Sequence, residues 1–230
     1  MTKSHTKTKY NWPKVKRKNI NGVRHYVDDE YNIYHSVTRV VNHGKDLTGW
    51  YHSMAKQYNV SYEQAEAIGE YIKINAGIQG TKLHTLCEDY LNNNQVCAAS
   101  LLPKAHFDNL KPYLDKINNI RGQEIQMFSK QLGLAGTVDC VAEYDGQLAI
   151  IDFKTSRKLK KEEWIESYYL QATAYSLMWE ENTGEKIEEI RILMTAETGE
   201  AQVFESNRNN WIDKLHEKIV EFKDTVKTVN

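Results

Sequence analysis

The chain has 230 residues, of which 40% are hydrophobic and 27% charged, a composition typical of a water-soluble globular domain. Its 14 Tyr, 5 Trp and 5 Phe exclude a wholly disordered chain, and no apolar run reaches the ~18 residues that a membrane span requires. The formal net charge of −1 hides a polarised chain, because residues 1–27 carry eight basic and no acidic side chains, while the remainder carries 22 basic and 31 acidic ones.

The cysteines indicate a reducing compartment. Cys87, Cys97 and Cys140 are odd in number and include no CxxC pair, which favours free thiols. The chain opens with no secretory apolar segment, and its Lys-rich start lacks the Arg/Ser amphipathic character of a transit peptide. We therefore expect a cytoplasmic location, which would be the host cytoplasm for a phage-encoded protein.

The N-terminal region is expected to hold a basic arm and then short strands. Residues 1–18 are interpreted as a flexible arm, and residues 19–230 as one domain, because no Pro/Gly/Ser-rich linker divides them. Asn21-Gly22 predicts a hairpin turn before a strand at Val23–Val27. A second extended run is expected over Ile33–Val41.

Helical patterns follow. Residues Ser61 to Gln64 fit a capping box, which opens a helix expected to end near Asn75. Apolar residues at i, i+3, i+4, i+7 and i+8 mark another helix with one buried face: Leu83, Leu86, Cys87, Tyr90 and Leu91. A third helix is predicted by Phe107, Leu110, Leu114 and Ile117, with a kink or reset at Pro112.

From residue 123 the pattern becomes that of a sheet with helices. The predicted elements are strands at Glu124–Gln131, Leu134–Tyr144 and Gln147–Thr155, a helix at Lys161–Asn182, a hairpin of Ile187–Ala196 and Ala201–Glu205, and a closing helix from Trp211 to Val226. This order predicts an α/β domain with N-terminal strands and helices over 19–121, a sheet and helix over 122–206, and a C-terminal helix over 207–230.

One predicted hairpin carries a concentration of charge. If Asp145-Gly146 is a two-residue loop, Asp139 lies directly opposite Asp152, with Cβ atoms about 4.5–5.5 Å apart, and Lys154 shares the face of Asp152. Two carboxylates this close require a proton or a cation, and Mg²⁺ is held by such groups. The alternative is a solvent-exposed hairpin. The unbroken apolar run 148–151 argues against it, because such a strand is covered on both faces.

These residues resemble motifs of the PD-(D/E)XK nuclease superfamily. Asp139 stands for the first acidic residue, although Thr137-Val138 replaces the nominal proline, and Asp152-Phe153-Lys154 stands for the (D/E)XK triplet. Three further segments match motifs of RecB-type members: Ser36-Val37-Thr38 (S-V-T), Gly80 to His84 (GxxxH) and Gln171 to Tyr175 (QxxxY). The order of motifs, over about residues 33–182, is most similar to mitochondrial genome maintenance exonucleases and their phage relatives.

The resemblance implies a restriction-endonuclease-like αβββαβ core, in which helices flank a central mixed sheet, with an N-terminal helical elaboration. It implies Mg²⁺, replaceable by Mn²⁺, held by His84, Asp139, Asp152 and the carbonyl of Phe153. Without the other motifs, His84 would be interpreted as a core or capping residue. The implied catalytic set is Asp139, Asp152, Lys154, Gln171 and Tyr175. Glu124 is expected either to be a second-shell partner of Lys154 or to face solvent.

Contacts with DNA are expected at two places. Ser36 and Thr38 would share one side of a strand and contact a phosphate, or simply belong to a surface strand. The cation-rich run after the hairpin supplies further phosphate contacts, or is a solvated face: Ser156, Arg157, Lys158 and Lys161.

The sequence therefore predicts a Mg²⁺- or Mn²⁺-dependent DNA exonuclease that prefers single strands with a free end and acts in replication, recombination or repair. We expect a monomer with no membrane partner, which works beside replication or recombination proteins. Three alternatives remain: a structure-selective endonuclease with the same site, a catalytically silent nucleic-acid-binding subunit, and a structural α/β module with an incidental charged hairpin.

Overall fold

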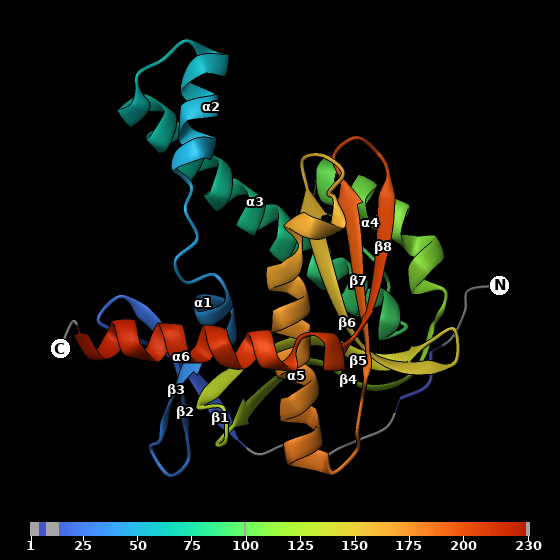
Figure 1. Ribbon diagram of the computed structural model, residues 1–230. Helices are drawn as coiled ribbons and strands as arrows, with labels where there is room; N and C mark the ends of the chain where they lie inside the picture. Colours follow the sequence, from blue (N-terminus) through green and yellow to red (C-terminus); the bar gives the residue numbers. More distant parts are fainter. Residues whose placement is uncertain (1–4, 8–13, 99, 229–230) are drawn as a thin grey trace.

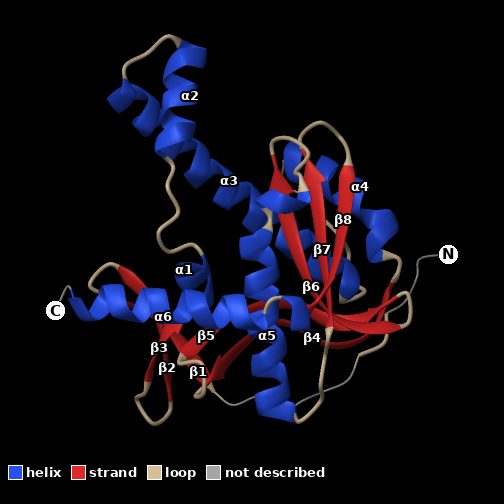
Figure 2. Cartoon of the chain, in the orientation of Figure 1, coloured by secondary structure: helices blue, strands red, loops and turns tan. Residues whose placement is uncertain are grey.

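The computed structural model describes residues 5–7, 14–98 and 100–228. It contains one mixed sheet flanked by helices (Figures 1 and 2). The strands are β1 (Val15–Ile20), β2 (Val23–Asp28), β3 (Ile33–Ser36), β4 (Ile117–Ser129), β5 (Leu134–Tyr144), β6 (Gln147–Ser156), β7 (Glu189–Ala196) and β8 (Ala201–Asn207). The helices are α1 (Val37–Val41), α2 (Thr48–Tyr58), α3 (Tyr62–Leu91), α4 (Leu101–Leu114), α5 (Glu166–Thr183) and α6 (Ile212–Thr228), with 3₁₀ turns at Glu162–Trp164 and Arg208–Asn210.

The N-terminal expectations need two corrections. Residues 15–18 are not part of a flexible arm, because they form β1 against β2, where Val15 is buried; residues 1–4 and 8–13 lie outside the described part. The predicted turn is present, with positive φ at Asn21 and Gly22. The extended run from Ile33 ends at Ser36. Val37, Val40 and Val41 have helical spacing and are all buried in α1.

The predicted capping box is confirmed and the extent of its helix is wrong. Ser61 Oγ accepts from the Gln64 backbone N–H at 3.3 Å, and the Gln64 side chain accepts from the Ser61 N–H at 3.0 Å. The helix does not end near Asn75, because α3 runs unbroken to Leu91 and absorbs the next predicted helix. The third helix ends at Leu114, and Ile117 begins β4.

The catalytic core follows the predicted αβββαβ order, with α3–α4, β4, β5, β6, α5 and β7 in sequence. β5 and β6 pair in the predicted register, from Tyr144–Gln147 to Cys140–Ile151, and β7 lies parallel to β6. One face of the sheet packs against α1, α5 and α6. The other face packs against α3 and α4, so the sheet is covered on both sides as its apolar strands predict.

β5 is shared between two parts of the sheet. One of its edges pairs with β4 from Leu134 to Tyr144. Along its other edge, β3 pairs with residues 134–135 and β6 pairs with residues 140–144. Residues 136–139 of β5 therefore span a fork between β3 and β6, and Asp139 stands at its inner end. Among the described helices, none is both long and apolar enough to cross a bilayer.

Candidate active site

The two aspartates of the hairpin are held at the fork. Asp152 on β6 is only 1% exposed and Asp139 on β5 is 8% exposed. Asp139 Oδ2 accepts a hydrogen bond of 2.8 Å from the backbone N–H of Phe153. This bond extends the β5–β6 ladder by one side-chain contact beyond the Cys140–Ile151 pair, and it fixes the direction of the Asp139 carboxylate.

Three side chains from different elements converge beside Asp139. His84 comes from α3, Glu124 from β4 and Asp139 from β5, and one donor atom of each lies within 4.8 Å of the others. His84 Nδ1 is 3.5 Å from both Glu124 Oε1 and Asp139 Oδ1. Two carboxylates and an imidazole form a donor set that suits Mg²⁺ or Mn²⁺. The residues present therefore fit a divalent metal site.

Glu124 is exposed and lies on β4 beside the cluster. Its flanking residues pair as Gln123–Cys140 and Ile125–Val138, so Glu124 faces Asp139, and its carboxylate lies next to His84 rather than next to Lys154. Its φ of 48° is in the left-handed region, which is costly for a non-glycine residue. Glu124 is exposed, as the solvent-facing alternative expects, and it also contacts His84.

The pKa of His84 reflects these neighbours. Burial lowers the pKa of the imidazole, but the charge of Asp139 and the contact with Glu124 outweigh burial and raise it to about 9. His84 Nε2 lies 2.8 Å from the Phe153 carbonyl oxygen. Two groups that the resemblance assigns to metal binding, the His84 ring and the Phe153 carbonyl, are thus in direct contact.

Lys154 is held against Asp152. Its ammonium forms an ion pair with Asp152 Oδ2 and lies 5.2 Å from the centre of the Tyr168 ring. Burial lowers the pKa of Lys154, yet the charges of Asp152 and Asp139 outweigh it and leave the pKa raised. For Asp152, burial raises the pKa to about 6 despite the opposing charge of Lys154.

Gln171 and Tyr175 on α5 complete the buried side of the site. Gln171 Nε2 donates to Asp152 Oδ1 at 3.3 Å and to the Tyr175 hydroxyl at 3.3 Å. Both residues are buried, so the amide gives the second oxygen of Asp152 a partner in a place that solvent does not reach. The QxxxY spacing thus brings both side chains to one face of the helix.

The site opens into a cleft of about 620 Å³. Of the predicted residues, it is lined by Ser36, Thr38, His84, Glu124, Asp139, Lys154, Gln171 and Tyr175. Ser36 and Thr38 do not share a strand, because α1 begins between them, but their hydroxyl oxygens are 2.9 Å apart. The predicted DNA-binding residues at the end of β6 and just after it are not among those that line the cleft: Ser156, Arg157, Lys158 and Lys161.

Sequence reasoning missed part of the cleft wall. Arg17 of β1, and Arg24 and Tyr26 of β2, also line it. Arg17 was assigned to the flexible arm of residues 1–18, whereas Arg24 and Tyr26 fall in the predicted strand Val23–Val27, and no cleft residue was expected there. Thr81, Thr85 and Glu88 lie on the same stretch of α3 as His84 and line the cleft as well.

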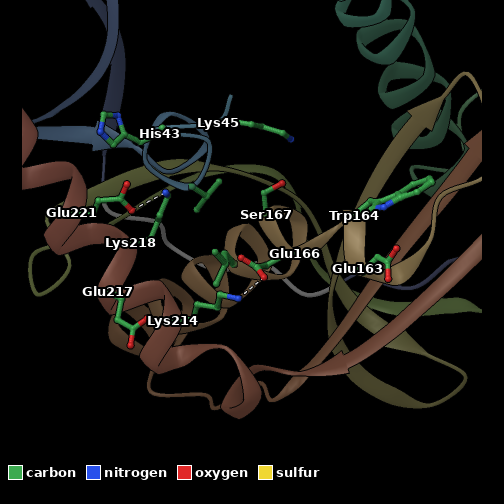
Figure 3. Close-up of a pocket in the computed structure, with 13 residues that line it drawn as sticks. His43, Lys45, Glu163, Trp164, Glu166, Ser167, Lys214, Glu217, Lys218 and Glu221 are labelled. Atoms are coloured by element: carbon green, nitrogen blue, oxygen red, sulfur yellow. Dashed lines mark hydrogen bonds and ion pairs between the residues drawn. The ribbon is translucent and has the colours of Figure 1, made fainter. Parts of the chain in front are cut away.

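A second cavity, of about 600 Å³, lies beside α1, α5 and α6 (Figure 3). Its lining mixes both signs of charge, and two of its lysines form ion pairs, Lys214 with Glu166 and Lys218 with Glu221. Both hollows are lined in part by α5: Glu166, Ser167 and Leu170 line the cavity, and Gln171 and Tyr175 line the cleft.

The fold, the acidic pair Asp139 and Asp152 on β5 and β6, and Lys154 on β6 agree with a family match. A model of the PD-(D/E)XK nuclease superfamily matches residues 50–228. The chain belongs to this superfamily. Its members use divalent metal ions, which accords with the His84, Glu124 and Asp139 cluster.

Two curated relatives are both named mitochondrial genome maintenance exonuclease 1. The human protein is 30% identical over 156 residues, which cover 63% of this chain and 43% of the relative. The Mus musculus protein is 30% identical over 97 residues, 41% of this chain and 28% of the relative. The chain thus spans less than half the length of the curated relatives it matches. A crystal structure of a protein from Eubacterium rectale covers 66% of both chains at 16% identity, with a TM-score of 0.48; the family assignment does not rest on it.

Proposed function

We propose that the protein is a divalent-metal-dependent exonuclease that hydrolyses phosphodiester bonds of single-stranded DNA. The observation that carries this proposal is the meeting of His84, Glu124 and Asp139 in one cleft with the Lys154–Asp152 pair. The names of the curated relatives support the choice of an exonuclease.

In this proposal His84, Glu124 and Asp139 hold Mg²⁺ or Mn²⁺, with Asp152 and the Phe153 carbonyl beside them. The bound ion supplies Lewis-acid stabilisation of the charge that develops on the scissile phosphate. The Lys154 ammonium, held by Asp152 and Tyr168, donates a hydrogen bond to the attacking water or to a phosphate oxygen. Gln171 and Tyr175 keep the Asp152 carboxylate in place.

The need for a free DNA end is proposed from the helices around the cleft. Figure 1 shows α2 and the first part of α3 projecting away from the sheet before α3 returns toward it. The cleft and the cavity of Figure 3 are both lined by residues of α1 and α5, since Thr38 and Gln171 line the cleft while Val41 and Leu170 line the cavity. A DNA single strand that follows the cleft and then the cavity would pass beneath residues 42–80. A duplex is about twice as wide as one strand, and a circle has no end to enter.

The test is digestion of end-labelled linear single-stranded DNA, linear duplex and circular single-stranded DNA, each with Mg²⁺, with Mn²⁺ and with chelator. We expect degradation of the linear single strand in either metal and no degradation with chelator. Activity that survives chelation contradicts the metal mechanism, and cleavage of the circle supports the endonuclease alternative.

A matched pair of variants tests the site itself. Asp139→Asn removes a proposed metal ligand, whereas Asp145→Asn changes an exposed aspartate in the loop of the same hairpin, at a positive φ that Asn tolerates. We expect loss of activity only in the first. Equal activity in both variants would overturn the proposed site, and an inactive wild type would favour the catalytically silent or structural alternatives.

A further inference from the structure

Two arginines of the β1–β2 ribbon face the same cleft as the proposed metal centre. Arg17 and Arg24 both line it. The register pairs Arg17 with Tyr26 and Asn19 with Arg24, so the two arginines are diagonal neighbours on one face of the ribbon. The same face carries Tyr26, which is buried and lines the cleft. The two guanidinium groups therefore point to the side on which the site lies.

The ribbon is attached to the strand that carries Asp139. Tyr26 packs with Val15, Tyr34 and Ala135 in a small buried cluster, and the Tyr34 hydroxyl donates to Asp28 Oδ2 at 2.8 Å. β3 then pairs Ser36 with Ala135 of β5. The backbone that carries the arginines is thus positioned relative to β5 by buried contacts rather than by a loop.

The positive charges of the two guanidinium groups are available to bind an anionic ligand. Both arginines are exposed, and no carboxylate of residues 5–7, 14–98 or 100–228 forms an ion pair with either of them. The nearby acids Glu124 and Asp139 face His84 instead. Each guanidinium presents five N–H donors in a planar fork, a geometry that matches the oxygens of a phosphate.

We propose that Arg17 and Arg24 together bind a backbone phosphate of the DNA strand, at a position separate from the metal centre. This inference rests on the proposed function. Because a phosphate at this position does not react, the arginines hold the strand equally in the ground state and in the transition state. Their loss therefore raises KM and leaves kcat nearly unchanged.

The experiment measures binding without cleavage. Wild type, Arg17→Gln/Arg24→Gln and Lys16→Gln/Lys18→Gln are titrated against fluorescent oligothymidylate of about 20 nucleotides, in chelator, over about 50–200 mM salt. The lysine pair is the matched control, because it lies on the same strand β1, loses the same charge and occupies the opposite face of the ribbon. Arg17→Lys/Arg24→Lys, which keeps the charge, is measured as well, and thermal unfolding of each variant verifies folding.

We expect the arginine-to-glutamine variant to bind about tenfold more weakly and to lower the slope of log K against log salt by about 0.7, the contribution of one single-strand phosphate contact. The lysine control changes the slope by less than half as much, and the conservative Arg→Lys variant keeps most of it. Equal slopes for the two glutamine variants overturn the arginine site. That result leaves the proposed nuclease intact if wild type still degrades DNA with metal and Asp139→Asn does not, so the two proposals fail separately.

Discussion

The ring of Tyr175 lies against the backbone of Gly136 so closely that a Cβ atom at position 136 would lie 2.7 Å from Tyr175 Cε1 and 2.9 Å from its hydroxyl oxygen. Tyr175 is almost completely buried, and Gln171 donates to its hydroxyl, so a shift of the ring would strain or break this hydrogen bond. Only glycine at position 136 allows α5 to approach β5 at the fork.

Gly136→Ala is expected to destabilise the protein by about 1–3 kcal/mol, the usual cost of overpacking, and to reduce nuclease activity because Gln171 and Tyr175 shift. Gly77→Ala is the control, since a Cβ there meets nothing within 4 Å and alanine favours the helix by up to about 1 kcal/mol. Urea unfolding of both variants measures the difference. Equal stability of the two would show that the Tyr175 contact is not tight.

Glu124→Gln is expected to weaken Mn²⁺ binding by more than about tenfold, because a carboxylate of the proposed metal cluster becomes a neutral amide. Glu88→Gln provides the comparison: Glu88 lines the same cleft one turn along α3 from His84 but is not part of the cluster. Isothermal titration with Mn²⁺ gives both affinities. If the two variants bind alike, Glu124 is not a ligand.

Lys154→Met leaves the Asp152 carboxylate buried without the ammonium that pairs with it. In chelator, where no metal is bound, the variant should be about 3 kcal/mol less stable than wild type. Asp152→Asn/Lys154→Met removes both charges and should cost less than Lys154→Met alone. Both variants should lose activity by more than about a hundredfold. Lys186→Met, which breaks an exposed pair with Glu188, should cost less than about 1 kcal/mol. A double variant less stable than Lys154→Met would contradict the ion-pair account.

The stability of the metal-free protein should fall as pH rises from 6.5 to 9. The pKa of His84 is raised from 6.5 to about 9 in the folded protein, so protonated His84 stabilises the fold fully below pH 6.5 and loses this effect as pH passes 9. The shift corresponds to up to about 3 kcal/mol. Asp152, with its pKa raised to about 6, contributes in the same direction at lower pH, between 3.8 and 6.

Urea unfolding in chelator at several pH values measures this dependence, with His84→Asn as the variant that cannot titrate. The slope between pH 6.5 and 9 should largely vanish in His84→Asn. The expectation is wrong if wild type and variant lose stability in parallel.

The hairpin at the site was predictable because its geometry is local. A two-residue turn at Asp145-Gly146 fixes the pairing of the next residues, and the observed pairs from Tyr144–Gln147 to Cys140–Ile151 follow from it. The same holds for the Ser61–Gln64 capping box and for the i, i+4 relation of Gln171 and Tyr175. Each depends only on residues close together in the chain.

The remaining parts of the site depend on contacts between distant segments. Ser36 reaches β5 through parallel pairing with Ala135, about 100 positions later in the chain, and no local pattern fixes that register. Glu124 itself has a positive φ and lies in a strand with a register shift, and its side chain contacts His84, which is 40 positions earlier in the chain. Arg17 was assigned to an arm because β1 has few apolar residues and Val15 alone carries little signal of burial. Arg24 lies in the predicted strand Val23–Val27, but no local pattern shows that this strand lines the cleft.

Two different parts of β5, on either side of the fork, position the acidic pair and the β1–β2 ribbon. The hydrogen bonds to β6 set the spacing of Asp139 and Asp152, whereas the two residue pairs with β3 hold the ribbon that bears Arg17 and Arg24. The proposed chemistry and the proposed contact with the DNA backbone therefore depend on different residue pairs of β5. Because the pairs with β3 include neither Asp139 nor Asp152, we expect substitutions of Arg17 and Arg24 to change DNA binding without displacing the two carboxylates.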